Sequence, residues 1–352
     1  MALCVMPKGA LPTLIEKLVA KQRVVGPKRV PRGPDSSQFG FGEIKTPDEL
    51  ELDYPYTILP PKHWLLPRDE KLFAFKLGPQ PEVAPVIEAE PTVFFGVHPP
   101  DIAGIACLDE AMSDRNPDPN YLARRDKVTI VGTEISPQEY QYAKFLGNDV
   151  ADSGYDLFLT DIGEAYVCDV ATEKGQAIMD LVETRPATAS DIAAVETARR
   201  AIAEQAESVL DVNVRLLPLT MTKAADSGVW EKHSEPCFRC GSCNLVCPTC
   251  YCFNVTDVVE PNLTTGARVR TWDGCMLDTF AAVAGGESFR EKAKDRLFHR
   301  VSRKFHYQYT KYGHPHCTGC GRCVRTCVAG INQFDAINDL LAEQAEGVPH
   351  GR

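Results

Sequence analysis

Two copies of one cysteine pattern lie in the last third of this chain, and no other feature of the sequence restricts its structure as strongly. The first run comprises Cys237, Cys240, Cys243 and Cys247, followed by a proline, and the second comprises Cys317, Cys320, Cys323 and Cys327. Bacterial proteins with two [4Fe–4S] clusters use this C-x-x-C-x-x-C-x-x-x-C spacing, and each cluster there takes three thiolates from one run and its fourth from the other. The spacing therefore predicts one cluster on Cys237, Cys240, Cys243 and Cys327, and a second on Cys317, Cys320, Cys323 and Cys247.

Structural zinc is the alternative for these eight cysteines. Zinc sites usually occur as two C-x-x-C pairs rather than as two triplets, each with a fourth cysteine further on, so the spacing favours iron–sulfur clusters. A disulfide framework normally accompanies export. The N-terminal sequence MALCVMPKGALPTL lacks the long apolar stretch of a secretory signal. We therefore expect a cytoplasmic protein whose cysteines bind metal.

Three further cysteines lie in the same region, at Cys250, Cys252 and Cys275. They indicate either a third metal site or buried thiols that pack as small hydrophobic side chains. A third cluster needs a fourth ligand, for which the nearby candidates are Asp273, His314 and His316. Alternatively, both histidines are loop residues that precede the second run and bind no metal.

The cysteine-rich part of the chain is basic, although the chain as a whole is acidic. Residues 221–330 carry 15 lysines and arginines against 10 aspartates and glutamates, whereas the net charge of all 352 residues is −10. Helical spacing places Arg296, Arg300 and Lys304 on one face. That face is either a solvated surface or a row of cations beside an anionic cluster or a partner subunit. A pI of about 5.4 and the lack of a recognition fold argue against nucleic-acid binding.

The predicted elements indicate an α+β protein. In it an N-terminal α/β domain is joined by a long helix to a bacterial-type two-[4Fe–4S] ferredoxin-like domain with a helical insert. We expect an irregular β-rich segment over residues 1–90, an α/β scaffold or docking domain over 91–185 and a helical linker over 186–225. The two-cluster domain is expected over 226–335, and a C-terminal helix and tail over 336–352. Strands are predicted at 91–98, 127–132, 155–160 and 164–170, and helices at 11–20 and 190–210.

Motifs for nucleotide binding and catalysis are missing from the sequence. It contains no G-x-x-x-x-G-K-[ST] and no G-x-G-x-x-G after a strand, and no pairing of a nucleophile with a base stands out. No apolar run approaches the ~18–20 residues of a membrane helix. The residues therefore favour a carrier of single electrons over a stand-alone reductase that binds substrate in its α/β domain.

Beyond the spacing of the cysteines, the sequence resembles one family of electron-transfer subunits. The resemblance rests on C-x-x-C-G-x-C-x-x-x-C-P-T-C-Y-C-F at 237–253, W-D-x-C at 272–275, V-A-G-G at 283–286 and C-x-G-C-G-R-C at 317–323. These runs are similar to the beta subunits of cytoplasmic NADP-linked nickel–iron hydrogenases (sulfhydrogenases) and to the iron–sulfur subunit of anaerobic sulfite reductase that belongs to the same family. A weaker similarity extends upstream through residues 60–75, 94–105 and 154–163.

The resemblance implies a non-catalytic subunit that passes single electrons between a catalytic subunit, here a nickel–iron hydrogenase, and a flavin/NAD(P)H subunit. FAD and NAD(P) are then expected on the partner, and a sulfite- or sulfur-reducing complex is the alternative. Relatives often carry a cysteine in the segment that reads G-V-H-P-P-D at 96–101 in this chain. We therefore expect the N-terminal domain to lack a cluster of its own and to serve as a scaffold.

Overall fold

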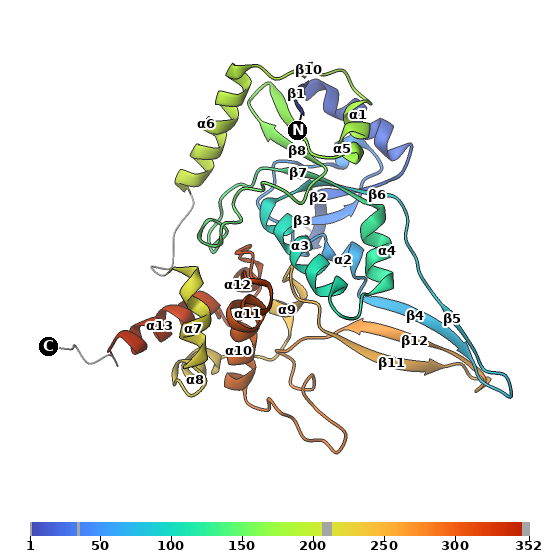
Figure 1. Ribbon diagram of the computed structural model, residues 1–352, viewed down its shortest axis with the longest axis vertical. Coiled ribbons are helices and arrows are strands. Elements are labelled where there is room, and N and C mark those ends of the chain that lie inside the picture. Colours follow the sequence, from blue (N-terminus) through green and yellow to red (C-terminus); the bar gives the residue numbers. More distant parts are fainter. Residues whose placement is uncertain (1, 34–35, 206–212, 347–352) are drawn as a thin grey trace.

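The computed structural model describes residues 2–33, 36–205 and 213–346, and its largest element is an eight-stranded mixed sheet (Figure 1). The strand order is β10-β1-β9-β8-β7-β6-β2-β3. In chain order these strands are β1 (Ala2–Pro7), β2 (Arg23–Gly33), β3 (Ser36–Glu43), β6 (Thr92–Val97), β7 (Val128–Thr133), β8 (Leu157–Asp161), β9 (Ala165–Val170) and β10 (Arg185–Pro186). Strands β2, β6, β7 and β8 run parallel, and the outer strands pair antiparallel.

The centre of this sheet is buried on both faces. Every residue of β6 and β7 is buried, as expected for parallel strands that are covered by helices on each side. The covering helices are α1 (Leu11–Val19), α3 (Pro99–Ser113), α4 (Pro119–Lys127), α5 (Glu173–Met179) and α6 (Ala189–Gln205). Alternate residues of β6 pack into two separate hydrophobic clusters, because successive side chains of a strand point to opposite faces.

The first 90 residues contribute regular strands to this same sheet. The sequence predicted an irregular segment before an α/β unit beginning at residue 91, but β2 pairs with β6 directly, so that boundary falls within one sheet. Strand β2 contains Pro27 and Pro31, which read as loop residues in the sequence. Both prolines lie beyond the short stretch that pairs with β6, where β2 pairs with β3 alone, and a proline is tolerated there because one side of the strand is free.

A second, four-stranded antiparallel sheet projects from the body as an arm (Figure 1). Its order is β11-β12-β4-β5, with β4 (Asp69–Lys76), β5 (Glu82–Pro85), β11 (Phe253–Val259) and β12 (Thr265–Trp272). The prediction of a helical insert between the two cysteine runs is therefore wrong for β11 and β12, and helices occupy only its later part. Apolar residues at alternate positions, Phe253, Val255 and Val259, and the turn residues at 261–262 are the strand signal there. This sheet joins distant parts of the chain, because β4 pairs with β12.

The cysteine-rich unit is mainly helical. Its elements are α7 (Leu217–Thr222), α8 (Val229–Ser234), α9 (Ser242–Leu245), α10 (Ala293–Ser302), the π-helical turn η5 (Arg303–Tyr307), α11 (Gln308–Tyr312), α12 (Arg322–Arg325) and α13 (Gln333–Glu346). Buried aromatic side chains of Trp230, Phe305 and Phe334 form its core with Cys275 and Cys317. Shorter elements elsewhere are α2 (Lys62–Leu65), η1 (Lys8–Ala10), η2 (Pro47–Glu49), η3 (Lys144–Leu146) and η4 (Val214–Leu216).

The mixed content of helix and sheet confirms the predicted α+β class. The long helix α6 ends at Gln205, and residues 206–212 of the predicted linker lie outside the described residues, as does the predicted tail at 347–352. Among the described helices, none has the length and apolar character needed to cross a membrane.

Candidate iron–sulfur centres

Two short helices place the cysteine runs against each other. Helix α9 carries Cys243 and helix α12 carries Cys323, and the two helices are in contact. Each begins directly after a glycine in the left-handed region, Gly241 with φ +70° and Gly321 with φ +75°. A glycine adopts this conformation without the steric cost that a Cβ atom brings. The chain can therefore turn sharply between the second and third cysteine of each run.

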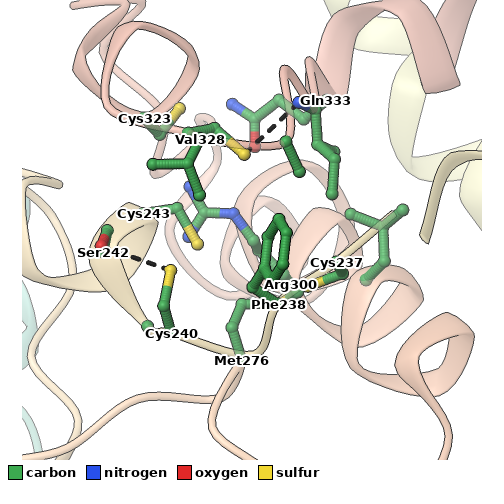
Figure 2. Close-up of a pocket in the computed structure, with 15 residues that line it drawn as sticks. Cys237, Phe238, Cys240, Ser242, Cys243, Met276, Arg300, Cys323, Val328 and Gln333 are labelled. Atoms are coloured by element: carbon green, nitrogen blue, oxygen red, sulfur yellow. Dashed lines mark hydrogen bonds between the residues drawn. The ribbon is translucent and has the colours of Figure 1, made fainter. Parts of the chain in front are cut away.

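The first predicted set of four cysteines lines one cavity (Figure 2). Cys237, Cys240 and Cys243 come from the first run, and Cys327 from the second. Cys323 also reaches this cavity. The four cysteines that the spacing assigns to one cluster thus lie around one cavity.

The second predicted set lines another cavity nearby. Cys317, Cys320 and Cys323 of the second run lie around it with Cys247 of the first run. Gly319 within this loop has φ +73°, and a Cβ atom there would lie 2.4 Å from the carbonyl carbon of Tyr142. The backbone N–H of Tyr142 donates to the carbonyl of Gly319 at 2.8 Å. This loop therefore packs directly against the segment that follows β7.

Arg300 lies at the centre of the cysteine region and lines both of these cavities and a third one. Its side chain is buried, and among the described residues its Nη1 has no hydrogen-bond partner. Burial disfavours its charged form, but the surrounding thiols, Cys243 foremost, raise the pKa of the Arg300 guanidinium well above its ordinary value. A buried unpaired cation is costly. An anionic thiolate-bound cluster would balance this charge, so the donor set and its surroundings fit such a group.

Two buried lysines, Lys304 and Lys62, also lie near the cysteines. Lys304, one turn after Arg300 along the same helical run, donates to the hydroxyl of Thr249. Lys62 donates to the carbonyl of Cys250 at 2.7 Å and lies over the ring of Trp272. Within the described part of the chain, neither lysine pairs with a carboxylate. The predicted row of cations thus faces the cysteines at two of its three positions.

The third position of that row has another role. The guanidinium of Arg296 donates to the carbonyls of Arg290 and Glu291 at 2.7 and 2.6 Å, and so it fixes the loop that precedes α10.

The three additional cysteines lie together around the third cavity. Cys250, Cys252 and Cys275 line it with Arg300, Arg303, Lys304 and His316. Among the predicted fourth ligands, His316 alone lines this cavity. The carboxylate of Asp273 accepts from the N–H of Gly274, and the ring of His314 contacts Glu110.

A buried ion pair joins the two halves of the chain, and the sequence did not predict it. Arg322, between Gly321 and Cys323, donates to both carboxylate oxygens of Asp101 at 2.5 and 2.6 Å. Its Nε donates to the carbonyl of Thr57 at 2.6 Å. Lys62 was missed as well. No local signal marks Asp101 or Lys62, because their partners lie about two hundred residues away in the sequence.

Comparisons with known proteins agree with this geometry. Residues 236–331 match the family model described as a 4Fe-4S dicluster domain. Fold and site therefore define an iron–sulfur protein of the electron-transfer class.

The similarity extends over almost the whole chain. It is 35% identical over 341 residues to the sulfhydrogenase 2 subunit beta of Pyrococcus furiosus, covering 94% of this chain and 95% of that protein. The chain belongs to the family of sulfhydrogenase beta subunits.

Proposed function

We propose that this chain carries single electrons through two [4Fe–4S] clusters between a nickel–iron hydrogenase and the flavin/NAD(P)H subunit of its complex in the cytoplasm. The first cluster is assigned to Cys237, Cys240, Cys243 and Cys327, and the second to Cys317, Cys320, Cys323 and Cys247. The observation that carries this proposal is the crossed arrangement, in which each set of four thiols surrounds one cavity and Arg300 borders both. When bound, each cluster supplies a centre that accepts and releases one electron.

The sequence of this chain indicates which cofactors belong to a partner subunit. Hydride donors release two electrons at once, and a flavin is the usual group that separates them. This sequence contains no nucleotide-binding fingerprint, so we assign FAD and NAD(P) to a partner subunit. The similarity to a hydrogenase beta subunit supports hydrogenase as the catalytic partner.

An apolar surface beside the first cavity is the proposed contact with a partner. Phe238 and Val328 line that cavity (Figure 2). They are nevertheless 72% and 78% exposed. Cys240 is the exposed cysteine of this set, whereas Cys247 and Cys317 of the second set are buried. Large exposed apolar side chains that border a redox site are typical of a docking surface.

Iron and acid-labile sulfide per chain, with EPR spectra after dithionite reduction, test the cluster assignment on anaerobically purified protein. We expect about eight irons and two interacting [4Fe–4S] signals. Cys243→Ser should disrupt one cluster and electron flow while leaving partner binding intact. The matched control Cys168→Ser alters a buried thiol of β9 and should leave iron unchanged. Zinc without a reducible signal would refute the proposal.

The same iron count decides the role of Cys250, Cys252 and Cys275. About twelve irons per chain mean that these three cysteines hold a third cluster, whose binding the neighbouring cations Arg303 and Lys304 would favour. About eight irons mean that they are buried thiols.

Electron transfer to isolated partner subunits tests the docking surface. Phe238→Ser and Val328→Ser should slow reduction of the chain by its partner without changing its iron content. Leu263→Ser is the matched control, since Leu263 is 74% exposed and follows β11 on the arm. Equal slowing by all three variants would contradict the assigned surface.

Two alternatives predict different partners or none. An electron-transfer subunit of a sulfite- or sulfur-reducing complex would have the same cysteine sites and a different catalytic partner. A stand-alone reductase would turn over substrate as the isolated chain, and reduction of sulfite or elemental sulfur by that chain would favour it.

A further inference from the structure

A group of metal-ligating side chains lies outside all three cysteine cavities assigned above, apart from one shared histidine. The ligand atoms of Cys107, His314 and His316 all lie within 4.8 Å of one another. We propose that these three residues and Glu110 bind one Zn²⁺ ion, which joins helix α3 to the segment that precedes the second cysteine run. This proposal does not rest on the electron-transfer function.

The fold presents the four side chains from two sides. Cys107 and Glu110 are three residues apart in α3, and this spacing places them on one face of the helix. The segment after α11 supplies the imidazoles on the opposite side. The Nε2 atom of His314 lies 2.9 and 3.0 Å from the two carboxylate oxygens of Glu110, and the Nε2 atom of His316 lies 3.3 Å from one of them.

The burial of His316 is the observation that most strongly indicates a bound ion. Its side chain is about 98% buried, and neither ring nitrogen makes a directed hydrogen bond to any described residue, although a carboxylate oxygen of Glu110 lies 3.3 Å from Nε2. The ring is held in place by stacking on Tyr312 and His314, with centroid distances of 4.8 and 5.4 Å. An imidazole buried in this way loses hydrogen bonds to water without replacement. A metal ion would bind the lone pair of the unprotonated ring nitrogen.

The chemistry of the four donors matches zinc. A thiolate, two imidazoles and a carboxylate form a set that tetrahedral Zn²⁺ accepts. An iron–sulfur cluster takes mostly thiolates, and this group has one. The thiolate and the carboxylate carry two negative charges, which the ion neutralises, so the complex as a whole adds no net charge to the interior.

A cavity also gives the zinc ion access to this site from solvent. Cys107 and His314 line a cavity of about 340 Å³ that extends to the loop at 146–154. His314 and Glu110 are each about two-fifths exposed at their side chains. The site is therefore reachable from solvent after the chain has folded.

Such an ion would fix the second cysteine run in place. His316 directly precedes Cys317, and α3 already carries Asp101, which holds Arg322 inside the same run. The zinc site and this ion pair would attach the loop of 314–323 to α3 at both ends.

Metal analysis of the full chain, purified anaerobically after growth with zinc, tests the proposal. We expect about one zinc per chain. X-ray absorption at the zinc edge should show one sulfur neighbour at ~2.3 Å with nitrogen and oxygen neighbours at ~2.0–2.2 Å. The zinc edge is separate from that of iron, so clusters do not interfere.

Variants then assign the ligands. Cys107→Ser and His314→Gln should each lower bound zinc from about one per chain to near zero, with iron content unchanged. Cys168→Ser and His233→Gln are matched controls, since they alter a buried thiol and an imidazole elsewhere, and they should keep the metal. Glu110→Gln should weaken binding in a zinc titration and is the variant of choice if Cys107→Ser does not fold.

Three outcomes would overturn the proposal. One is wild-type protein that neither contains zinc nor binds it when titrated with Zn²⁺ alone. Another is zinc that persists in both Cys107→Ser and His314→Gln, because it would then lie elsewhere. The third is loss of iron rather than zinc in Cys107→Ser. Failure of the electron-transfer function would appear in the iron count alone and is thus distinguishable from each of these.

Discussion

The buried pair between Asp101 and Arg322 is the contact whose loss should most damage the second cysteine site. Both side chains are almost fully buried, and the guanidinium makes two charge-assisted hydrogen bonds to the carboxylate. Asp101→Asn keeps the shape of this side chain and removes its charge. Arg322 would then remain as an uncompensated cation in the interior, which typically costs about 3–5 kcal/mol.

The cost can be measured as the rate at which iron is released. If iron escapes through an opening of the loop that exposes Arg322, the variant lowers the free energy of that opening by the lost interaction. A loss of about 3–5 kcal/mol raises the open population by roughly 10²–10⁴-fold, since each 1.4 kcal/mol is a factor of ten. Iron release to a colorimetric chelator under anaerobic conditions should accelerate by the same factor.

The control is Asp114→Asn in the same helix region. Asp114 pairs with Lys311, but both side chains are partly exposed, and such pairs contribute little because water screens them. Its iron release should match the wild type. The double variant Asp101→Leu with Arg322→Met should release iron more slowly than Asp101→Asn, because it leaves no unpaired charge. An acceleration below about tenfold in Asp101→Asn, or an equal one in Asp114→Asn, would refute the reasoning.

Three further predictions test other parts of the molecule. Arg300→Gln should lower the midpoint potentials of the neighbouring centres, by about 60 mV for each 1.4 kcal/mol of lost charge interaction, as measured by EPR-monitored redox titration. Gly319→Ala should reduce iron content, since its Cβ atom would clash with a backbone carbonyl at 2.4 Å, whereas Gly330→Ala, with φ +66° and no atom within 4 Å, should retain iron. The side chain of Cys168, which faces Cys4 across β1 and β9, lowers the pKa of the Cys4 thiol to about 7. The rate of alkylation of Cys4 should therefore be half-maximal near pH 7 and reach a plateau at higher pH. Cys168→Ala should move the midpoint of this pH profile upward, toward the pKa of ~8.5 of an ordinary thiol.

The arrangement of the cysteine sites was predictable because the spacing itself encodes it. Three cysteines separated by two residues cannot surround a cube without a fourth from elsewhere, and two such runs supply each other. The position of Arg300 and Lys304 was predictable for a similar reason, since helical periodicity places residues four apart on one face. The spacing within each cysteine run and the helical periodicity are both relations between residues that are close in the sequence.

Contacts between distant segments were not predictable in this way. Lys62 reaches the carbonyl of Cys250 because the pairing of β4 with β12 brings the two halves of the chain together. Strand β2 was not predicted, because its prolines argue against a strand when the sequence is taken alone. Whether a proline disrupts a strand depends on which side of that strand is paired, and the sequence does not show this. Neither fact is present in a local pattern, and each follows from the topology of a sheet.

The buried cations imply that cluster insertion and folding are coupled in this chain. Arg300 borders three cysteine-lined cavities, and Lys304 borders two of them. In the described part of the molecule no carboxylate compensates either charge. Without clusters, closing this region would bury two cations at a cost of several kcal/mol each, a large share of the ~5–15 kcal/mol that stabilises a typical domain. Thiolate-bound clusters supply the missing negative charge. The free energy of cluster binding therefore contributes to the free energy of folding. The cysteine unit should therefore be loosely packed until its iron and sulfide are in place, and the same charges that require the clusters would afterwards favour their reduced state.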